Sequence, residues 1–157
     1  MRILSDSLTV SAAQASDIPQ IVAWQMMMAL ESEGLTLDIN ALRQGVTHVI
    51  ESPKIGQYYL AAIGGRPVGC ALTLYEWSDW RCGEVVWIHS VYVENEHRRS
   101  GVFSKIYEHI KGIVSQTDRF RGLRLYVDKS NLTAQKTYEA LGMTDQHYKL
   151  YEWMKTF

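Results

Sequence analysis

Apolar residues in the first part of the chain recur at the four-residue spacing of a helix that is buried on one side. This stripe consists of Ile18, Val22, Met26 and Leu30. Asp17 precedes the stripe and can cap the helix, because its side chain can accept hydrogen bonds from unpaired N–H groups of the first turn. Gly34 favours an end to this helix, and a second helix is predicted from an Asp38 cap to about Ile50. A short strand over residues 8–13 precedes both helices.

The spacing of apolar residues then changes to that of strands. Residues 57–63 (QYYLAAI) and 67–77 (PVGCALTLYEW) are rich in β-forming side chains, and the Gly-Gly-Arg between them favours a hairpin turn. Residues 78–83 (SDWRCG) predict the next turn. The strand that follows, residues 84–93 (EVVWIHSVYV), is apolar on both faces, which is typical of a central strand covered on both sides.

The last third of the chain predicts two more helices and further strands. The apolar face of the first of these helices consists of Phe103, Ile106, Tyr107, Ile110 and Val114. Residues 123–127 (LRLYV) predict a buried strand. The next helix is predicted over residues 132–141, with Asn131 as its cap and Gly142 as its end. Residues 145–154 (DQHYKLYEWM) predict one or two final strand pieces.

These elements give the order β-α-α-β-β-β-α-β-α-β within one α/β domain that spans residues 1–157. A helix that joins the fourth strand to the fifth requires at least one parallel crossover. We find no internal repeat, low-complexity segment or Pro/Gly/Ser-rich linker that would divide the chain. A chain of this length can bury a core of its own.

Composition limits the classes of partner. Of the 157 residues, 46% are hydrophobic, and 16 basic against 17 acidic residues leave a net charge of -1. This balance argues against a nucleic acid or an anionic membrane as the main partner. Cys70 and Cys82 form no Cys-x-x-Cys pair, so we expect no metal site. The sequence shows neither a secretory signal nor an apolar run that could span a membrane, so we expect a cytoplasmic protein with reduced thiols.

One short stretch combines positive charge with a flexible backbone where a strand becomes a helix. Residues 96–103 read EHRRSGVF. The first turn of a helix leaves N–H groups unpaired and carries partial positive charge, and together these bind phosphate. Gly101 has no Cβ, so an anion can approach the backbone, while Arg98 and Arg99 can add bidentate hydrogen bonds. Taken alone, the stretch also fits a solvated turn with surface arginines.

Two segments resemble motifs of the GNAT superfamily of acetyl-CoA-dependent N-acetyltransferases. In the first, Q/R-x-x-G-x-G/A follows an apolar strand; Arg98 and Gly101 match it, whereas Phe103 departs from the final Gly or Ala. The second, N-x-x-A-x-x-x-Y-x-x-x-G-F/M, is matched by Asn131, Ala134, Tyr138, Gly142 and Met143. The resemblance covers nearly the whole chain. It implies a central mixed, mostly antiparallel sheet of six to seven strands with about four helices, splayed apart between the fourth and fifth strands.

The resemblance also implies where acetyl-CoA would bind. The pantetheine arm would pair like an extra strand with the fourth strand, at Val91, Tyr92 and Val93. The pyrophosphate would meet the loop and first helical turn formed by Arg98, Arg99, Ser100, Gly101, Val102, Phe103 and Ser104. Asn131 and Tyr138 of the second motif complete the expected cofactor site.

Acetyl transfer to an amine requires a base for the amine, stabilisation of the carbonyl oxygen and a proton for the leaving thiolate. By resemblance, a backbone N–H of the fourth strand polarises the carbonyl, and Tyr138 protonates the sulfur. His89 on the same strand is the candidate base, because histidine titrates near neutral pH. Glu84 at the start of the strand is a second candidate. His89 and Tyr138 are also compatible with packing roles in a core.

The candidate acceptor-binding residues are Glu31, Trp77 and Trp80. Aromatic rings and carboxylates together would hold a cationic amine, although the same residues also fit a packed turn and a solvated helix end. The predicted function is transfer of an acetyl group from acetyl-CoA to a primary amine of a small molecule or peptide, by direct attack in a ternary complex.

Two other functions stay open at this point. A catalytically silent acyl-CoA sensor is the first alternative, because Phe103 departs from the motif and the base is not identified. An interaction protein with exposed aromatic side chains is the second. A homodimer is a further expectation, since residues 145–154 could pair across a two-fold axis.

Overall fold

The structure, a computed structural model, describes residues 7–156. The chain divides into two compact units, of which the first ends at Arg124 and the second begins at Leu125. The first unit contains the sheet and the helices that cover it. The second contains the helix of the second sequence motif.

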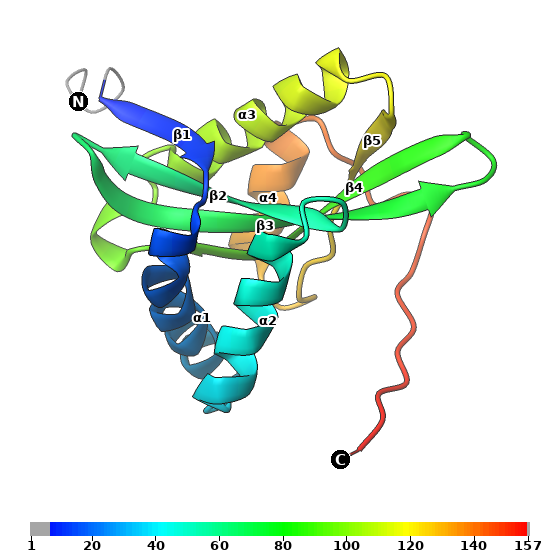
Figure 1. The fold of residues 1–157 in the computed structure, drawn as a ribbon. Helices are drawn as coiled ribbons and strands as arrows, with labels where there is room; N and C mark the ends of the chain where they lie inside the picture. Colours follow the sequence, from blue (N-terminus) through cyan, green and yellow to red (C-terminus); the bar gives the residue numbers. More distant parts are fainter. Residues whose placement is uncertain (1–6, 157) are drawn as a thin grey trace. The chain divides into compact units, whose positions relative to one another are not determined.

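A five-stranded sheet forms the centre of the described part of the first unit. Its strands are β1 Leu8–Ala12, β2 Gly56–Ile63, β3 Arg66–Ser78, β4 Gly83–Val93 and β5 Phe120–Arg124. The strands follow one another across the sheet in chain order (Figure 1). The pairs β1–β2, β2–β3 and β3–β4 are antiparallel, and β5 runs parallel to β4. The predicted parallel crossover is therefore confirmed, and the helix between β4 and β5 makes it.

The helices of this unit begin and end largely where local sequence signals predict. They are α1 Ile18–Glu33, α2 Ile39–Glu51 and α3 Val102–Gln116. α1 ends at Gly34, whose φ of 64° is left-handed, and Asp38 caps α2 by accepting from the N–H groups of Asn40 and Ala41. The prediction that Asp17 caps α1 is wrong. A short 3-10 turn precedes α1 and holds Asp17 in a helical conformation, and its carboxylate accepts instead from the N–H of Gln14.

The buried face of α1 differs from the predicted stripe. Its buried residues are Ile21, Val22, Trp24, Gln25 and Ala29, whereas Leu30 is 59% exposed. The reason is geometric, since each step of four residues turns about 40° beyond a full helical turn, and a stripe at that spacing winds off the buried face. Steps of three and four residues used together stay on the buried face, as from Ile21 to Trp24 and from Ile21 to Gln25.

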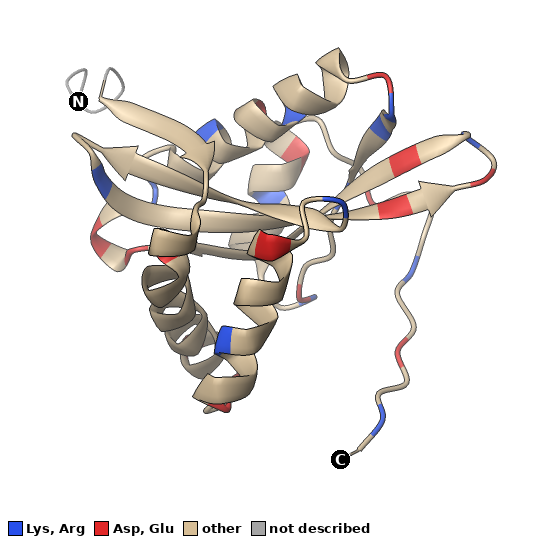
Figure 2. Ribbon diagram, viewed as in Figure 1, with Lys and Arg blue, Asp and Glu red and all other residues tan. Residues whose placement is uncertain are grey.

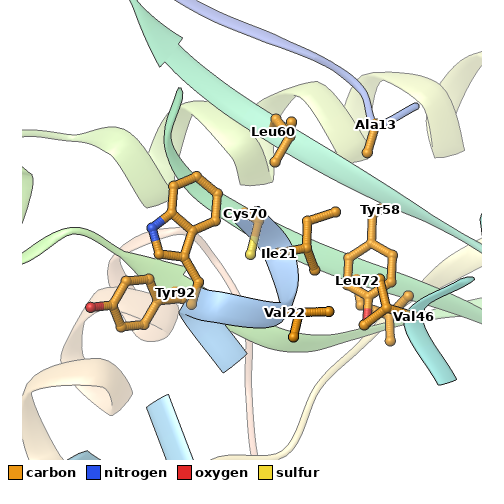
Figure 3. Close-up of a cluster of buried hydrophobic side chains, with 10 residues drawn as sticks. Ala13, Ile21, Val22, Val46, Tyr58, Leu60, Cys70, Leu72 and Tyr92 are labelled. Carbon is orange, nitrogen blue, oxygen red and sulfur yellow. The ribbon is translucent and has the colours of Figure 1, made fainter. Parts of the chain in front are cut away.

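The core lies between the sheet and the pair formed by α1 and α2. Its cluster consists of Ala13, Ile21, Val22, Trp24, Val46, Tyr58, Leu60, Cys70, Leu72 and Tyr92 (Figure 3). α3 packs on the other face of the sheet, with Ile106 and Ile110 fully buried (Figure 1). Val85 and Val86 are adjacent on β4 and are 3% and 2% exposed, which confirms that this strand is covered on both faces.

Within residues 7–156 the sheet has five strands, so the predicted count of six to seven is not confirmed. Residues 145–154, expected to end the chain as strand pieces, form no strand and are exposed. A strand exists only where its main chain pairs with another strand, so a β-rich composition alone cannot create one. β5 also begins earlier than the predicted 123–127, because Phe120 pairs with Glu84 of β4 and its ring packs 5.1 Å from that of Tyr75.

Charged residues of both signs are distributed along the elements of each unit (Figure 2). Among the described residues, no helix combines the length and apolarity needed to cross a membrane. In the same part of the chain, no group of three or more His, Cys, Asp and Glu side chains is arranged to hold a metal ion.

Candidate active site

The ladder between β3 and β4 contains a bulge at the start of the segment predicted to pair with the pantetheine arm, Val91 to Val93. The pairing register shifts between Cys70 and Leu72 of β3, so that Ser90 and Val91 of β4 together oppose a single residue. Ser90 takes a φ of 51°, which is uncommon for a residue with a side chain. A bulge of this kind changes the direction in which the backbone groups of the strand point.

β4 loses its β5 partner next to the bulge. The parallel ladder between the two strands ends at the pair Trp87–Arg124. From Ile88 to Val93, β4 pairs only with β3 among the described residues of the first unit. Because an unpaired strand edge is a template for an extended partner, this edge can bind a chain that carries amide groups.

The loop after β4 enters α3 through two residues in left-handed conformations. A 3-10 turn at Asn95–His97 is followed by Arg99 with a φ of 62° and Gly101 with a φ of 82°. None of the described side chains caps the start of α3, and a Cβ at Gly101 would meet nothing within 4 Å. The backbone at Gly101 therefore adjoins open space, and it leads into a first helical turn whose N–H groups have no intrahelical partners, a backbone shape suited to binding an anion.

The side chain of Arg98 braces the end of β4. Its Nε donates to the carbonyl oxygen of Val93 at 2.9 Å, Nη1 to Asn95 Oδ1 at 3.5 Å, and Nη2 to Glu31 Oε2 at 2.8 Å. The guanidinium carbon also lies 5.4 Å from the centre of the Tyr92 ring. Glu31, predicted on the acceptor side, thus pairs with the loop predicted to bind phosphate.

Phe103 occupies the second position of α3, where the motif has a small residue. Its ring lies 6.3 Å from that of Tyr107, one helical turn further on. Tyr107 is buried, so this contact directs the Phe103 ring along the helix.

His89 lies on β4 immediately before the bulge. Its ring is stacked with that of Trp87 at a centroid distance of 6.0 Å and an interplanar angle of 12°. Burial lowers the pKa of His89 below its ordinary value, because a desolvated site disfavours the charged imidazolium. At neutral pH the side chain is therefore held as the neutral imidazole, which is the form that accepts a proton.

Glu84, the second candidate base, is placed differently. Its carboxylate accepts from Arg119 Nε at 2.5 Å, at the start of β4. At about 3.3 Å per strand residue, Glu84 lies roughly 20 Å along the strand from Ser90. Of the two candidates, only His89 adjoins the bulge.

The second unit contains α4, Leu132–Ala140, and the remaining motif residues. Asn131 caps this helix by accepting from the N–H of Ala134 at 3.1 Å, and Gly142 follows it with a φ of 87°, as predicted. Tyr138 lies in the last turn of α4. Burial raises the pKa of Tyr138 above its ordinary value of 10.0, so the phenol keeps its proton at neutral pH, as a general acid must.

The three candidate acceptor residues are not brought together. Trp77 and Trp80 are 64% and 87% exposed near the turn between β3 and β4, so they do not belong to the core. Glu31 is bound to Arg98. Along β3, Trp77 lies roughly 23 Å from Cys70, the residue that contacts α1, at about 3.3 Å per residue.

Comparison with known proteins agrees with these features. A family model described as the acetyltransferase (GNAT) family matches residues 22–143, which include the bulge, the loop and both motifs. The chain belongs to the GNAT acetyltransferase family. A search of curated protein sequences gives no match.

Solved structures share the fold of this GNAT chain along nearly its whole length. A possible acetyltransferase from Clostridium difficile 630 is 35% identical, with a TM-score of 0.88 over 96% of this chain and 99% of that one. An integron cassette protein from the mobile metagenome of Cole Harbour Salt Marsh is 19% identical, with a TM-score of 0.83 over 98% and 93% of the two chains. An aminoglycoside acetyltransferase from an uncultured soil metagenomic sample, solved with sisomicin, is 14% identical, with a TM-score of 0.74 over 97% and 99%. The last two show the fold alone.

The contacts that α1 makes with β4 were not predicted from the sequence. The Nε2 of Gln25 donates to the carbonyl oxygen of Ser90 at 3.0 Å, and the ring of Trp24 stacks on that of Tyr92 at 6.2 Å. With the ion pair between Glu31 and Arg98, α1 contacts the second half of β4 and the loop after it at successive points. A sequence signal did exist, because Gln25 is an amide within an otherwise apolar run, VAWQMMMAL.

A second missed pair lies on the same face of the sheet as His89. Glu76 accepts from Arg124 at 3.4 Å, and Arg124 pairs in register with Trp87. Strand alternation places Glu76, Trp87 and His89 on one face. No local pattern in the sequence indicates this pair, since it joins β3 to β5 across β4.

Proposed function

We propose that this protein, as a single domain over residues 1–157, is an acetyl-CoA-dependent N-acetyltransferase that acts on a primary amine of a small molecule or peptide. The observation that carries the proposal is the continuity of two features. The edge of β4 that has no strand partner among the described residues of the first unit leads, through a short loop with left-handed Arg99 and Gly101, into a helix N-terminus without a side-chain cap. An extended arm with amide groups that ends in a diphosphate matches both features at once.

The residues present fit coenzyme A in kind and in order. Val91, Tyr92 and Val93 would pair with the pantetheine arm through their backbone. The loop and first turn, formed by Arg99, Ser100, Gly101, Val102, Phe103 and Ser104, would meet the pyrophosphate through backbone N–H groups. Arg98 adds positive charge at the start of this loop while its side chain braces β4. Asn131 would act indirectly, by holding the start of α4.

The chemistry is divided among side chains and one backbone group. Acetyl-CoA, when bound, supplies a thioester carbonyl that an amine can attack. His89 takes a proton from the amine, directly or through a water, because burial keeps its imidazole neutral. The N–H of Val91, within the bulge, stabilises negative charge on the carbonyl oxygen. Tyr138 returns a proton to the sulfur, and no metal takes part.

The acceptor is proposed to be a cationic amine that approaches on the His89 face of the sheet. Glu76 on that face offers a carboxylate to an ammonium group. Glu31 and the exposed Trp77 and Trp80 stay candidates for more distant contacts with a long acceptor. A small-molecule amine agrees with the aminoglycoside acetyltransferase that shares the fold. We propose a cytoplasmic location, and homodimerisation stays a prediction.

The first test is a calorimetric titration of the purified protein with acetyl-CoA. A thiol-release assay with a panel of aminoglycosides, polyamines, amino acids and lysine peptides follows it. Micromolar binding together with CoA release in the presence of at least one amine is the expected result. Binding without release from any amine would favour the acyl-CoA sensor instead. Absence of binding would overturn both functions and favour the interaction protein.

A further inference from the structure

Gln25 is a buried amide whose side-chain nitrogen donates to the bulge. It is 4% exposed and lies on α1 among apolar residues. Its Nε2 donates to the carbonyl oxygen of Ser90 at 3.0 Å and lies 3.6 Å from the sulfur of Cys70, which itself faces the same carbonyl. A buried amide is tolerated only where such partners are provided, so this position is specifically adapted to the bulge.

The bulge leaves the Ser90 carbonyl in need of a partner. At a bulge, one residue is not matched in the ladder, so its backbone groups must be satisfied elsewhere. Ser90 also has a positive φ of 51°, a conformation that persists only when neighbouring contacts hold it. Gln25 provides such a contact from a helix whose position is fixed by the fully buried Ile21 and Trp24.

The Ser90 carbonyl and the Val91 N–H belong to one peptide group. Peptide groups are planar, and none of the peptide bonds in the described residues is cis. In a trans peptide the C=O and N–H bonds point in opposite directions. A hydrogen bond that holds the Ser90 oxygen toward α1 therefore also holds the Val91 N–H directed away from α1.

We propose that Gln25 is a positioning residue that, through the Ser90–Val91 peptide, aims the Val91 N–H at the acyl carbonyl of the bound thioester. The inference rests on the proposed function, which assigns that N–H to the carbonyl oxygen. Gln25 does not touch the reacting atoms. It acts by limiting rotation of one peptide plane, and misdirection of a single donor is enough to weaken its bond to a developing oxyanion.

The test compares acetyl-CoA with CoA, because only the first carries the carbonyl that the Val91 N–H would bind. Both ligands are titrated calorimetrically into the wild type, Gln25→Met and Gln57→Met. Methionine retains the length of glutamine but donates no hydrogen bond. Gln57 is the matched control, since its Nε2 donates to the carbonyl oxygen of Tyr58 at 2.8 Å on β2, away from the bulge.

We expect the wild type and Gln57→Met to bind acetyl-CoA more tightly than CoA. In Gln25→Met this preference should fall about tenfold while affinity for CoA itself stays within about threefold, which is the split expected when one carbonyl donor is misdirected. With the acceptor found in the amine panel, the KM for acetyl-CoA should rise with this loss of affinity, and kcat should also fall, because the donor binds the developing oxyanion more strongly than the ground-state carbonyl. An equal loss of affinity for acetyl-CoA and for CoA would indicate that Gln25 has a merely structural role and would overturn the inference. If the wild type binds neither ligand, it is the proposed function that fails.

A measurement on the wild type alone covers the case in which Gln25→Met does not fold. The amide proton and nitrogen resonances of Val91 are followed by NMR during titration with each ligand. The Val91 amide should shift further with acetyl-CoA than with CoA, and the Gln25 side-chain amide should stay protected from exchange in both complexes. Identical shifts of the Val91 amide with the two ligands would overturn the proposal.

Discussion

The two halves of β4 differ in the features that bear on chemistry. From Glu84 to Trp87 the strand pairs with both β3 and β5, and Val85 and Val86 are buried on its two faces. From Ile88 to Val93 it has a bulge and pairs with β3 alone among the described residues of the first unit. The first half is called regular because its ladder with β3 is continuous, although its ladder with β5 shifts register between Glu84 and Val85. The second, irregular half leaves an edge that can bind an extended chain.

The difference shows how irregular backbone is maintained next to regular backbone. Side chains from α1 replace the missing ladder contacts, with Gln25 at the bulge and Glu31 bound to Arg98 at the end of the strand. Such contacts can be removed by single substitutions, whereas a sheet ladder cannot. Matched substitutions in the two halves, or in and outside the site, therefore test whether function belongs to the irregular half.

The largest effect on acetyl-CoA binding is expected at Gly101, at the end of the loop that follows the irregular half of β4. Gly101→Glu places a carboxylate beside the N–H groups of α3, where it would repel a diphosphate, so acetyl-CoA affinity should fall about 100-fold or more. Gly65→Glu is the matched control, because Gly65 has a φ of 83° against 82° at Gly101, and both adjoin open space. Calorimetry should show that Gly65→Glu binds acetyl-CoA with nearly the affinity of the wild type. Wild-type affinity in Gly101→Glu would place the phosphate site elsewhere.

The next effect concerns the proposed base. His89→Gln should lower kcat at pH 7 about 100-fold, as expected for loss of a general base. In the wild type the base works only when unprotonated, so activity should fall as pH decreases through the His89 pKa, which burial holds below 6.5. The variant should lose this acid limb. Glu84→Gln in the regular half is the control. If Glu84→Gln loses the acid limb of the pH–rate profile and His89→Gln keeps it, Glu84 and not His89 is the general base.

A smaller effect is expected in the second unit. Tyr138→Phe should lower kcat about tenfold or more if the phenol donates a proton to the sulfur. Burial raises the Tyr138 pKa above 10.0, so wild-type activity should fall only as pH increases through that higher value. Tyr151→Phe is the control, because Tyr151 is 88% exposed. Full kcat in Tyr138→Phe across the pH range would show that the first unit supplies the chemistry without this residue.

The smallest effect is expected at the brace between α1 and the loop. Glu31→Gln removes an ion pair whose two side chains are 40% and 44% exposed, so its contribution is only about 0.2–1 kcal/mol. The KM for acetyl-CoA should rise by up to about fivefold with kcat unchanged. Glu33→Gln on the same helix end should leave both constants as in the wild type. A rise in the KM for the amine alone would instead indicate that Glu31 contacts the acceptor.

Local signals in the sequence predicted the parts of the fold that depend on neighbouring residues. The caps at Asp38 and Asn131 and the helix ends at Gly34 and Gly142 are confirmed, because each involves contacts within a few residues of the chain. Asp17 shows the limit, since a 3-10 turn that no local signal indicated changed its conformation. Residues 145–154 have the composition of strands but no strand partner, and pairing is not a local property.

The amino-acid sequence by itself determined the order of most elements, both GNAT motifs and the identity of the candidate base and acid, because these are carried by short patterns. Only the tertiary structure decided how the site is held. The contacts between Gln25 and Ser90 and between Glu31 and Arg98 join residues 65 and 67 positions apart. The bulge within the irregular half of β4 likewise arises from the register with β3. Such long-range contacts depend on how the elements pack, and no short pattern encodes them.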